Sequence, residues 1–355
     1  MKNIGRLMEC INDEKTCALV TDDINRRFFT GFRSSAGTLL CFREKAYLII
    51  DFRYIEKAKK TVTACEVLEQ TKLTEQIGEL LKKHNAKSIA VESMELSIHR
   101  LNLFRKSFPD VEFIVTDELS DEIYRLRTVK TEYEIEKIQK AQQIAEAAFE
   151  EILNFIRPGV TERETALMLD STMMKCGAEA MSFETIVLSG ANTSMPHGVP
   201  QNQEVKSGDF VLMDFGAVYD GYHSDMTRTV CVGQPTDKMT EVYNIVLEAQ
   251  LAALDRVKSG ITGKELDAVA RDYISSRGYG DAFGHSLGHG VGLEIHEYPN
   301  ASQRSDAKLC ENNVITIEPG IYLPDEFGVR IEDFVVVTEK SCRNLTKCPK
   351  KMIIL

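Results

Sequence analysis

The chain has 355 residues, of which 43% are hydrophobic and 27% are charged. These fractions are ordinary for globular proteins and exclude a disordered or low-complexity chain. The formal net charge is -11 and the Lys and Arg residues are scattered, which excludes a basic stripe for a phosphate backbone, so we expect no nucleic-acid partner.

The first residues lack the apolar run of a secretory signal, and no later stretch approaches the roughly 18 apolar residues of a membrane span. We therefore expect no membrane association and a cytoplasmic location. The nine cysteines are an odd number, are dispersed from Cys10 to Cys348, and form no C-x-x-C pair. This pattern predicts reduced thiols rather than a disulfide framework or a zinc knuckle.

The first third of the chain alternates short β-rich runs with helical patterns. The strands are predicted at residues 17–21, 38–42, 47–51, 88–91 and 113–115. A helix is predicted at residues 73–84, where apolar residues recur at helical spacing. Together these elements predict a small α/β domain over residues 1–124.

A charged connection at residues 120–131 leads into a second domain, which we place at residues 125–355. Thr131 and Glu134 form a capping box, in which the two side chains satisfy free N–H groups at the start of a helix. Apolar residues then recur every three to four positions up to Ile152, which predicts one buried stripe on a long helix. We expect this helix to end at Pro158-Gly159.

The second domain contains an internal repeat. Residues 156–164 resemble residues 257–265 at a constant offset of 101. In both copies an amphipathic helix runs into a glycine turn, and a Thr-x-x-Glu capping box opens a second helix. The repeat predicts a duplicated α+β domain with pseudo-twofold halves and a cleft between them, where ligands commonly bind.

The first cluster of polar residues within an apolar context lies between residues 211 and 225. Asp220-Gly221 is a signal for a two-residue hairpin turn. Such a turn would place Asp214 opposite Thr227, with Asp225 diagonally across on the same face. Because a carboxylate at the end of a buried strand is costly without a compensating cation or hydrogen bonds, the two acids are candidate cation ligands.

The second cluster contains His285 and His289, which are spaced as in a helical zinc motif. The glycines around them argue against a helix, and the Glu of H-E-x-x-H is absent, so a thermolysin-like site is disfavoured. An extended segment fits this composition better.

The third cluster has two β-rich strands around a turn, carrying Glu318 and Glu332. Four carboxylates and one or two imidazoles, with no thiolate, suit Mn²⁺ or a similar ion better than a structural zinc. Taken singly, each residue has a plain structural alternative: a strand-end cap, a satisfied core histidine, or a Glu332–Arg330 pair on an exposed edge. Their combination favours the metal site, because the acids would otherwise repel one another.

In combination these motifs resemble the pita-bread metallopeptidase family, which includes aminopeptidase P, prolidase and methionine aminopeptidase. The matching segments are residues 213–217 with Asp225, and residues 288–292, 317–320 and 330–333. The resemblance covers essentially the whole chain. It implies an α+β fold, in which a pita-bread (creatinase/aminopeptidase) catalytic domain follows a smaller creatinase-like α/β domain.

The resemblance also implies two divalent metal ions per subunit, Mn²⁺ first and Co²⁺ or Zn²⁺ as alternatives. The implied metal ligands are Asp214, Asp225, His289, Glu318 and Glu332. Asp225 and Glu332 are expected to bridge the ions, Asp214 to bind one of them, and His289 and Glu318 to bind the other. The ions would lower the pKa of a shared water.

Roles for neighbouring residues follow from the same resemblance. The implied catalytic residues are His197, His296 and Glu318, the histidines bonding the reaction intermediate and Glu318 shuttling a proton to the leaving nitrogen. The implied substrate-binding residues are His197, His285, His296, Tyr322 and Arg330.

Substrate specificity is inferred from the extra N-terminal domain, since methionine aminopeptidases resemble the catalytic domain alone. We expect an Xaa-Pro aminopeptidase acting on peptides with proline at the second position. An Xaa-Pro dipeptidase (prolidase), restricted to dipeptides, is the alternative. A non-catalytic peptide-binding protein on the same fold is a rival from another class, although such relatives typically lose metal ligands. We also expect a homodimer, with the N-terminal domain contributing to the contact.

Overall fold

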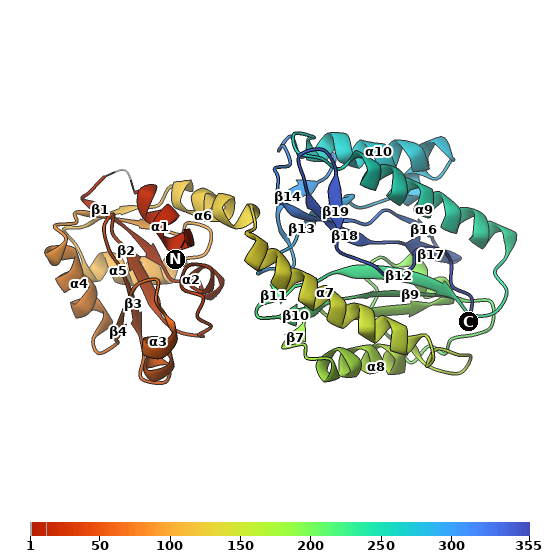
Figure 1. The fold of residues 1–355 in the computed structure, drawn as a ribbon, viewed down its shortest axis with the longest axis horizontal. Helices are drawn as coiled ribbons and strands as arrows, with labels where there is room; N and C mark the ends of the chain where they lie inside the picture. Colours follow the sequence, from red (N-terminus) through yellow and green to blue (C-terminus); the bar gives the residue numbers. More distant parts are fainter. Residues whose placement is uncertain (1, 12) are drawn as a thin grey trace. The chain divides into compact units, whose positions relative to one another are not determined.

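The computed structural model describes residues 2–11 and 13–355. The chain divides into two compact units, with the boundary between Arg127 and Thr128. The domain boundary expected from the sequence lies after residue 124, within helix α6 (Glu118–Thr128). The strands of each unit pair only with one another in the described residues (Figure 1), and each unit has its own hydrophobic core.

The N-terminal unit is built on a six-stranded sheet with the order β4-β3-β2-β1-β5-β6. Its strands are β1 (Thr16–Val20), β2 (Thr38–Cys41), β3 (Ala46–Ile50), β4 (Glu66–Glu69), β5 (Ser88–Val91) and β6 (Glu112–Ile114). Strand β2 pairs antiparallel with β1 and β3, and the other neighbours pair in parallel. The remaining helices of this unit are α1 (Lys2–Glu9), α2 (Asp23–Thr30), α3 (Ile55–Thr61), α4 (Leu73–Lys83) and α5 (Ile98–Ser107).

The predicted strands and helix of this unit are confirmed to within one residue at each end, and one strand was missed. Strand β4 has the sequence Glu-Val-Leu-Glu, with both glutamates exposed, and it lies at the edge of the sheet. A strand this short, with a charge at each end, carries too little apolar alternation to be recognised.

The C-terminal unit contains four long helices and the remaining strands. The helices are α7 (Glu132–Ile152), α8 (Glu162–Lys175), α9 (Asp237–Arg256) and α10 (Gly263–Ser276), with 3₁₀ turns η1 (Gly190–Ser194) and η2 (Gly280–Ala282). Strands of the first half are β7 (Ala180–Met181), β8 (Ile186–Ser189), β9 (Phe210–Phe215), β10 (Ala217–Tyr219), β11 (Tyr222–His223) and β12 (Met226–Cys231). Strands of the second half are β13 (Gly288–Gly290), β14 (Glu297–Ala301), β15 (Val314–Ile317), β16 (Gly320–Leu323), β17 (Phe327–Arg330), β18 (Asp333–Val337) and β19 (Cys342–Asn344).

The expected helix starts in this unit are confirmed by capping boxes at Thr131, Thr161 and Thr262. In each box the Thr side chain accepts the N3 backbone N–H and the N3 Glu side chain accepts the N-cap N–H. Helix α7 ends at Ile152, earlier than the predicted stop at Pro158-Gly159. Turn-type hydrogen bonds at residues 153–155 replace the last expected helical turn.

The internal duplication is visible in the backbone. Gly159 and Gly260 both adopt a φ of 90°, and the threonines two positions later, Thr161 and Thr262, each form an isolated antiparallel bridge with a later segment. Because a φ of 90° favours glycine, the two turns require the same residue for the same reason. Two equivalent helix–turn–helix units therefore begin the two halves.

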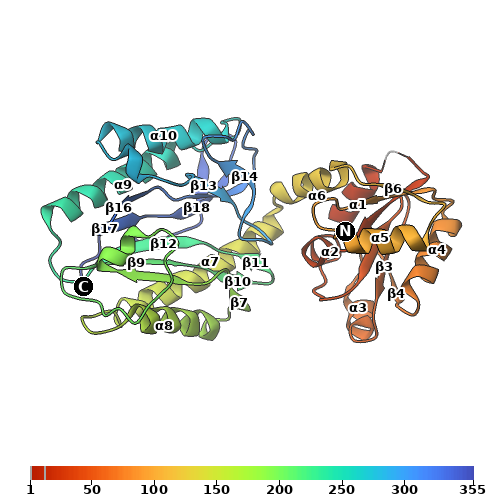
Figure 2. The same cartoon turned by 180° about the vertical axis from the view of Figure 1, so that it is seen from behind.

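Each half continues with three strands that form one sheet: β12-β9-β8 in the first half, and β13-β15-β18 within a five-stranded sheet in the second. Both views show these strands lying between α8 on one side and α9 with α10 on the other (Figures 1 and 2). The helix pairs pack on separate cores, one under α7 and α8 and one under α9 and α10. Within residues 2–11 and 13–355, none of the helices has the length and apolar content to cross a membrane.

Candidate active site

The first pair of predicted metal ligands is positioned by a hairpin. Asp220 and Gly221 adopt φ values of 49° and 78°, as a two-residue hairpin turn with both central residues in the left-handed region requires. The register confirms the prediction that Thr227 pairs with Asp214. Asp225 immediately precedes β12, so that both carboxylates approach the same cavity.

The second pair is positioned by an equivalent arrangement in the other half. Strand β15 pairs antiparallel with β18, so that Ile317 lies opposite Asp333, and β16 and β17 continue the same register beyond them. Glu318 and Glu332 occupy the short gap between the two pairings. The register therefore brings the two glutamates opposite each other, as Asp214 and Asp225 are brought together in the first half.

His289 lies in β13, which confirms the prediction of an extended segment. Glycines flank it because the neighbouring backbones are too close for a side chain. A Cβ added at Gly288 would overlap the carbonyl oxygen of Thr316, and one added at Gly290 would overlap that of Tyr298. The glycines thus allow β13 to lie between β14 and β15 and to direct His289 into the site.

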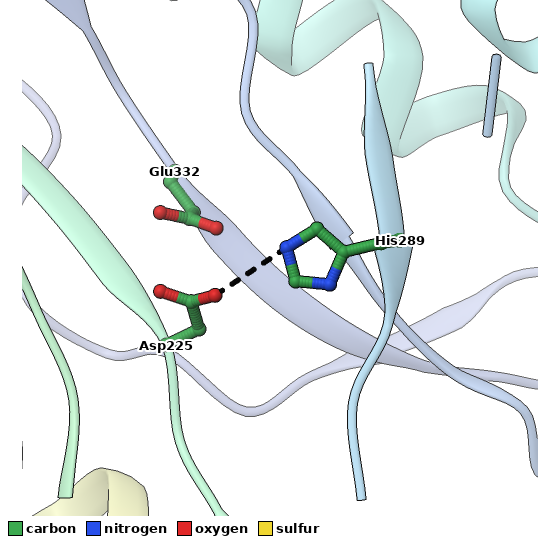
Figure 3. A group of neighbouring side chains, drawn as sticks. All are labelled: Asp225, His289 and Glu332. Carbon is green, nitrogen blue, oxygen red and sulfur yellow. Dashed lines mark ion pairs between the residues drawn. The ribbon is translucent and has the colours of Figure 1, made fainter. Parts of the chain in front are cut away.

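Asp225, His289 and Glu332 offer ligand atoms that all lie within 4.8 Å of one another (Figure 3). The Nε2 atom of His289 is 3.5 Å from an oxygen of Asp225 and 3.4 Å from an oxygen of Glu318. Its Nδ1 atom is 3.0 Å from the carbonyl oxygen of Gly290, an arrangement in which Nδ1 carries the proton and donates it. Nε2 is then left with its lone pair toward the carboxylates.

The electrostatics of these residues fit a cation. Burial, followed by the charges of neighbouring acids, holds the pKa of Asp225 and of Glu332 well above their usual range. Burial raises the pKa of Glu318 to about 8, although Arg330 opposes the rise. Burial also lowers the pKa of His289, which favours the neutral imidazole that binds metals. Divalent ions prefer such hard oxygen and imidazole donors.

Two buried oxygens also fit this interpretation. Among the residues that the structure describes, Oδ1 of Asp214 and Oε1 of Glu332 have no hydrogen-bond partner. Their other oxygens are occupied: Arg330 pairs with Asp214 through Oδ2, and the hydroxyl of Thr227 donates to Glu332 at 2.7 Å. Since buried acceptors are rarely left unpaired, the free oxygens suit metal ligands. The alternative that Arg330 pairs with Glu332 on an exposed edge is wrong, because both side chains are buried.

Arg330 belongs to a directed hydrogen-bond chain. Its guanidinium donates to the hydroxyl oxygen of Tyr322 at 2.7 Å, and this hydroxyl lies 2.9 Å from Nε2 of His285. Because a guanidinium only donates, the Tyr322 hydroxyl directs its proton to His285. The Nδ1 of His285 then donates to the carbonyl oxygen of Ser286 at 2.9 Å. Burial lowers the pKa of His285 to about 4, which keeps this imidazole neutral.

A cavity of about 680 Å³ contains nearly all of the predicted site residues. The predicted residues in its lining are His197, Asp214, Asp225, His285, His289, His296, Glu318, Arg330 and Glu332. Tyr322 lies outside this lining and reaches the site through Arg330 and His285. The ring of His296 lies 4.3 Å from that of His289, centroid to centroid, whereas the exposed side chain of His197 comes from a loop.

Other residues that line the cavity lie outside the sequence motifs from which the site was predicted. They include Phe183, Thr185, Val199, Asn300 and Ser302. Asn300 lies in β14, and the others lie in connections between elements, where neither periodicity nor spacing distinguishes them from ordinary loop residues.

A duplicated α+β domain whose cavity gathers buried carboxylates and a neutral histidine defines a metal-dependent hydrolase of the pita-bread class. Residues 136–339 match the Metallopeptidase family M24, and residues 7–129 match the Creatinase/Prolidase N-terminal domain. The chain belongs to metallopeptidase family M24. The predicted family, the α+β pita-bread fold and the metallopeptidase activity are thereby confirmed.

Similar proteins span nearly the whole chain. The Xaa-Pro dipeptidase of Pyrococcus furiosus is 41% identical over 94% of this chain and 94% of its own. The solved structure of an Xaa-Pro dipeptidase from Bacillus anthracis has a TM-score of 0.95 at 43% identity, covering 100% of this chain and 99% of that one. That of an X-Pro aminopeptidase from Thermotoga maritima has a TM-score of 0.91 at 42% identity, covering 96% and 97%.

Proposed function

We propose that this metallopeptidase is an Xaa-Pro dipeptidase, which hydrolyses the peptide bond before proline in dipeptides. The observation that carries the proposal is the cavity in which Asp225, His289 and Glu332 converge, in a chain 41% identical to an Xaa-Pro dipeptidase along nearly its full length. The aminopeptidase expected first from the sequence has less support, because several of the similar proteins are named as Xaa-Pro dipeptidases or prolidases.

We further propose that two divalent metal ions, Mn²⁺ first and Co²⁺ or Zn²⁺ as alternatives, bind in this cavity. The residues that would hold them are Asp214, Asp225, His289, Glu318 and Glu332. When bound, such ions act as Lewis acids and lower the pKa of a water molecule. The unpartnered oxygens of Asp214 and Glu332 and the mutual repulsion of the acids support this assignment.

The chain's own residues would orient these donors. Thr227 holds one oxygen of Glu332, and Arg330 holds one oxygen of Asp214, so that each carboxylate turns its other oxygen into the site. The hydroxyl of Thr316 donates to Glu318 at 3.0 Å. Glu318 would carry a proton from the attacking water to the leaving nitrogen of proline, as a positioned acid–base group does.

The histidines would have two different roles. His296 and His197 line the cavity and would donate hydrogen bonds to the oxygen that becomes negative as the carbonyl is attacked. His285 has Nε2 occupied by the Tyr322 hydroxyl. We therefore assign His285 and Tyr322 to the support of Arg330, which faces the cavity, rather than to direct donation of a hydrogen bond to substrate.

The homodimer, the cytoplasmic location and the domain limits 1–124 and 125–355 form part of the same proposal. The match of residues 7–129 to the Creatinase/Prolidase N-terminal domain supports a separate first domain. The molar mass in solution, measured by light scattering, tests the dimer.

Release of amino acids from Ala-Pro and from Ala-Pro-Ala tests the function. The protein is stripped of metal and resupplied with Mn²⁺, Co²⁺ or Zn²⁺. Metal-dependent cleavage of Ala-Pro alone is the expected result. The absence of cleavage with either peptide, in a protein that has bound metal, would favour the non-catalytic peptide-binding rival.

An Xaa-Pro aminopeptidase is the second candidate. It is favoured by the likeness to the structure of an X-Pro aminopeptidase, with a TM-score of 0.91. Efficient cleavage of Ala-Pro-Ala as well as Ala-Pro would replace the dipeptidase by this candidate.

A further inference from the structure

The loop at residues 190–200 carries His197 into the cavity. Its cavity-lining residues are Pro196, His197, Gly198, Val199 and Pro200. The side chains of Met195, His197 and Val199 are exposed. Because these side chains bury little apolar surface, burial holds residues 195–200 weakly, and their position depends on anchoring hydrogen bonds. Residues 190–194 form η1, where Thr193 is buried and its hydroxyl accepts the backbone N–H of Gly328 at 2.8 Å.

The main anchor is Glu162, the first residue of α8, whose side chain is completely buried. One carboxylate oxygen accepts the backbone N–H of Ser189 at 2.7 Å, the hydroxyl of Ser189 at 3.1 Å and the side-chain amide of Asn192 at 2.9 Å. The other oxygen accepts the backbone N–H of Gln201 at 2.9 Å. A single carboxylate thus binds the chain on both sides of His197.

The second half has a comparable arrangement at another position of its second helix. Asp267 in α10 is completely buried and accepts the backbone N–H of Leu287 at 3.0 Å. It also pairs with Arg271, which donates to the carbonyl oxygens of Phe283 and His285, each at 2.8 Å. In both halves, therefore, a buried carboxylate on the second helix anchors a segment that brings a histidine to the cavity.

We propose that Glu162 is a positioning residue for the reaction, which acts by holding residues 190–200 so that His197 meets the substrate. The inference rests on the proposed function, in which His197 bonds the reacting carbonyl oxygen. Misplacement of such a group by about 1 Å costs roughly a hundredfold in rate, so an anchor distant from the reacting atoms has a measurable effect.

The test compares Glu162→Gln with the wild type, both loaded with Mn²⁺. Glutamine keeps the shape but replaces one acceptor oxygen by a donor, so at least one of the groups that donate to Glu162 loses its partner. We expect kcat on Ala-Pro to fall about 10- to 100-fold, a smaller change in KM, and unchanged bound metal. Hydrogen exchange of the amides in residues 190–200 is expected to quicken.

The matched control is Glu164→Gln, two positions along the same helix. Glu164 is exposed, and among the described residues its side chain accepts hydrogen bonds from Thr161 alone. These bonds belong to the capping box, which a glutamine at this position also satisfies. Its kcat and the exchange of residues 190–200 are expected to match the wild type.

A double-mutant cycle with His197→Ala separates positioning from general stability. If Glu162 acts through His197, Glu162→Gln causes little further loss of kcat once His197 is alanine. If Glu162→Gln lowered kcat by the same factor in the wild type and in His197→Ala, the proposal would be overturned. Asn192→Ala, which removes one donor on the loop side, is a milder variant with the same expected non-additivity, and it serves if Glu162→Gln does not fold.

Failure of the proposed function is distinguishable from failure of this inference. A wild-type protein that releases nothing from Xaa-Pro peptides refutes the function, but the exchange measurement needs no substrate. Exchange of residues 190–200 that is equally slow in Glu162→Gln and Glu164→Gln refutes the anchor, whereas faster exchange in Glu162→Gln alone supports it.

Discussion

Glu332 illustrates how a side chain at this site is suited to binding a cation and not to stabilising the fold. It is 1% exposed, one oxygen accepts from Thr227, and the other has no partner in the described part of the chain. Burial and the charges of Asp225 and Glu318 raise its pKa, which means that its ionised form destabilises the metal-free fold. Burying such a carboxylate lowers the stability of the fold unless a cation is bound, and this unfavourable burial indicates a cation site.

We therefore predict opposite effects of Glu332→Gln on stability and on metal binding. The metal-free variant is expected to have a higher melting temperature than the metal-free wild type at pH 8, because glutamine removes the cost of burying an ionisable carboxyl group among other acids. Bound Mn²⁺, measured by elemental analysis, and the rate on Ala-Pro should both fall, the rate by more than about a hundredfold. Glu326→Gln, which alters only an exposed pair with Lys238, is the control. An unchanged metal content in Glu332→Gln would contradict the ligand assignment.

Thr227→Val tests the support of that ligand. The variant keeps the shape of the side chain but leaves a second oxygen of Glu332 unpaired, and it also removes the acceptor of the Arg330 Nε–H at 3.1 Å. Removing a partner of this kind typically lowers metal affinity or activity by about 10- to 100-fold. Titration of the metal-free protein with Mn²⁺ measures the affinity, and an affinity equal to that of the wild type would refute the supporting role.

The raised pKa of Glu318 predicts how the stability of the metal-free protein depends on pH. Its carboxyl holds a proton in the folded state up to a pKa of about 8, above the ordinary value of 4.5. Between these two values the folded state binds more protons than the unfolded state, so stability falls as pH rises. The melting temperature after metal removal should drop by at least about 2 °C from pH 5.5 to pH 8. Glu318→Gln should reduce this drop.

At the scale of single elements, β13 shows how glycine composition positions a ligand. A Cβ at Gly288 would overlap the carbonyl oxygen of Thr316 on β15, whereas one at Gly284 meets nothing within 4 Å. The first glycine is therefore required by close approach of two backbones. Gly284, in contrast, has space around it for a side chain.

We predict that Gly288→Ala destabilises the protein by about 1–3 kcal/mol, as overpacking does, and displaces His289. Gly284→Ala is the matched control and should leave the free energy of unfolding within about 0.5 kcal/mol of the wild type. Urea unfolding measures both. Equal stabilities of the two variants would show that β13 tolerates separation from β15.

At the scale of the whole molecule, the two units have separate cores and the site lies entirely in the second. A unit with its own core is expected to fold alone. The fragment of residues 128–355 should therefore unfold in one cooperative thermal transition and bind Mn²⁺. A broad transition without metal binding would show that the second unit depends on the first.

Several features of this protein follow from local interactions and were predictable. The Asp220-Gly221 turn sets the register of its own hairpin, which brings Asp214 and Asp225 together although they are eleven positions apart. The capping boxes and the repeated glycine turns likewise depend on neighbours in sequence, and they revealed the helix starts and the duplication. The motif combination then indicated the family, and with it the set of candidate ligands.

Other features depend on contacts between distant segments, which periodicity and spacing do not encode. Arg330 pairs with Asp214, 116 positions away, and Tyr322 reaches the site through Arg330 and His285. The cavity lining at Phe183 and Asn300, like the missed edge strand β4, carries no pattern of its own. These details were decided when segments distant in the sequence packed together, because the partner of a buried charge or of an edge strand is set by the path of the whole chain.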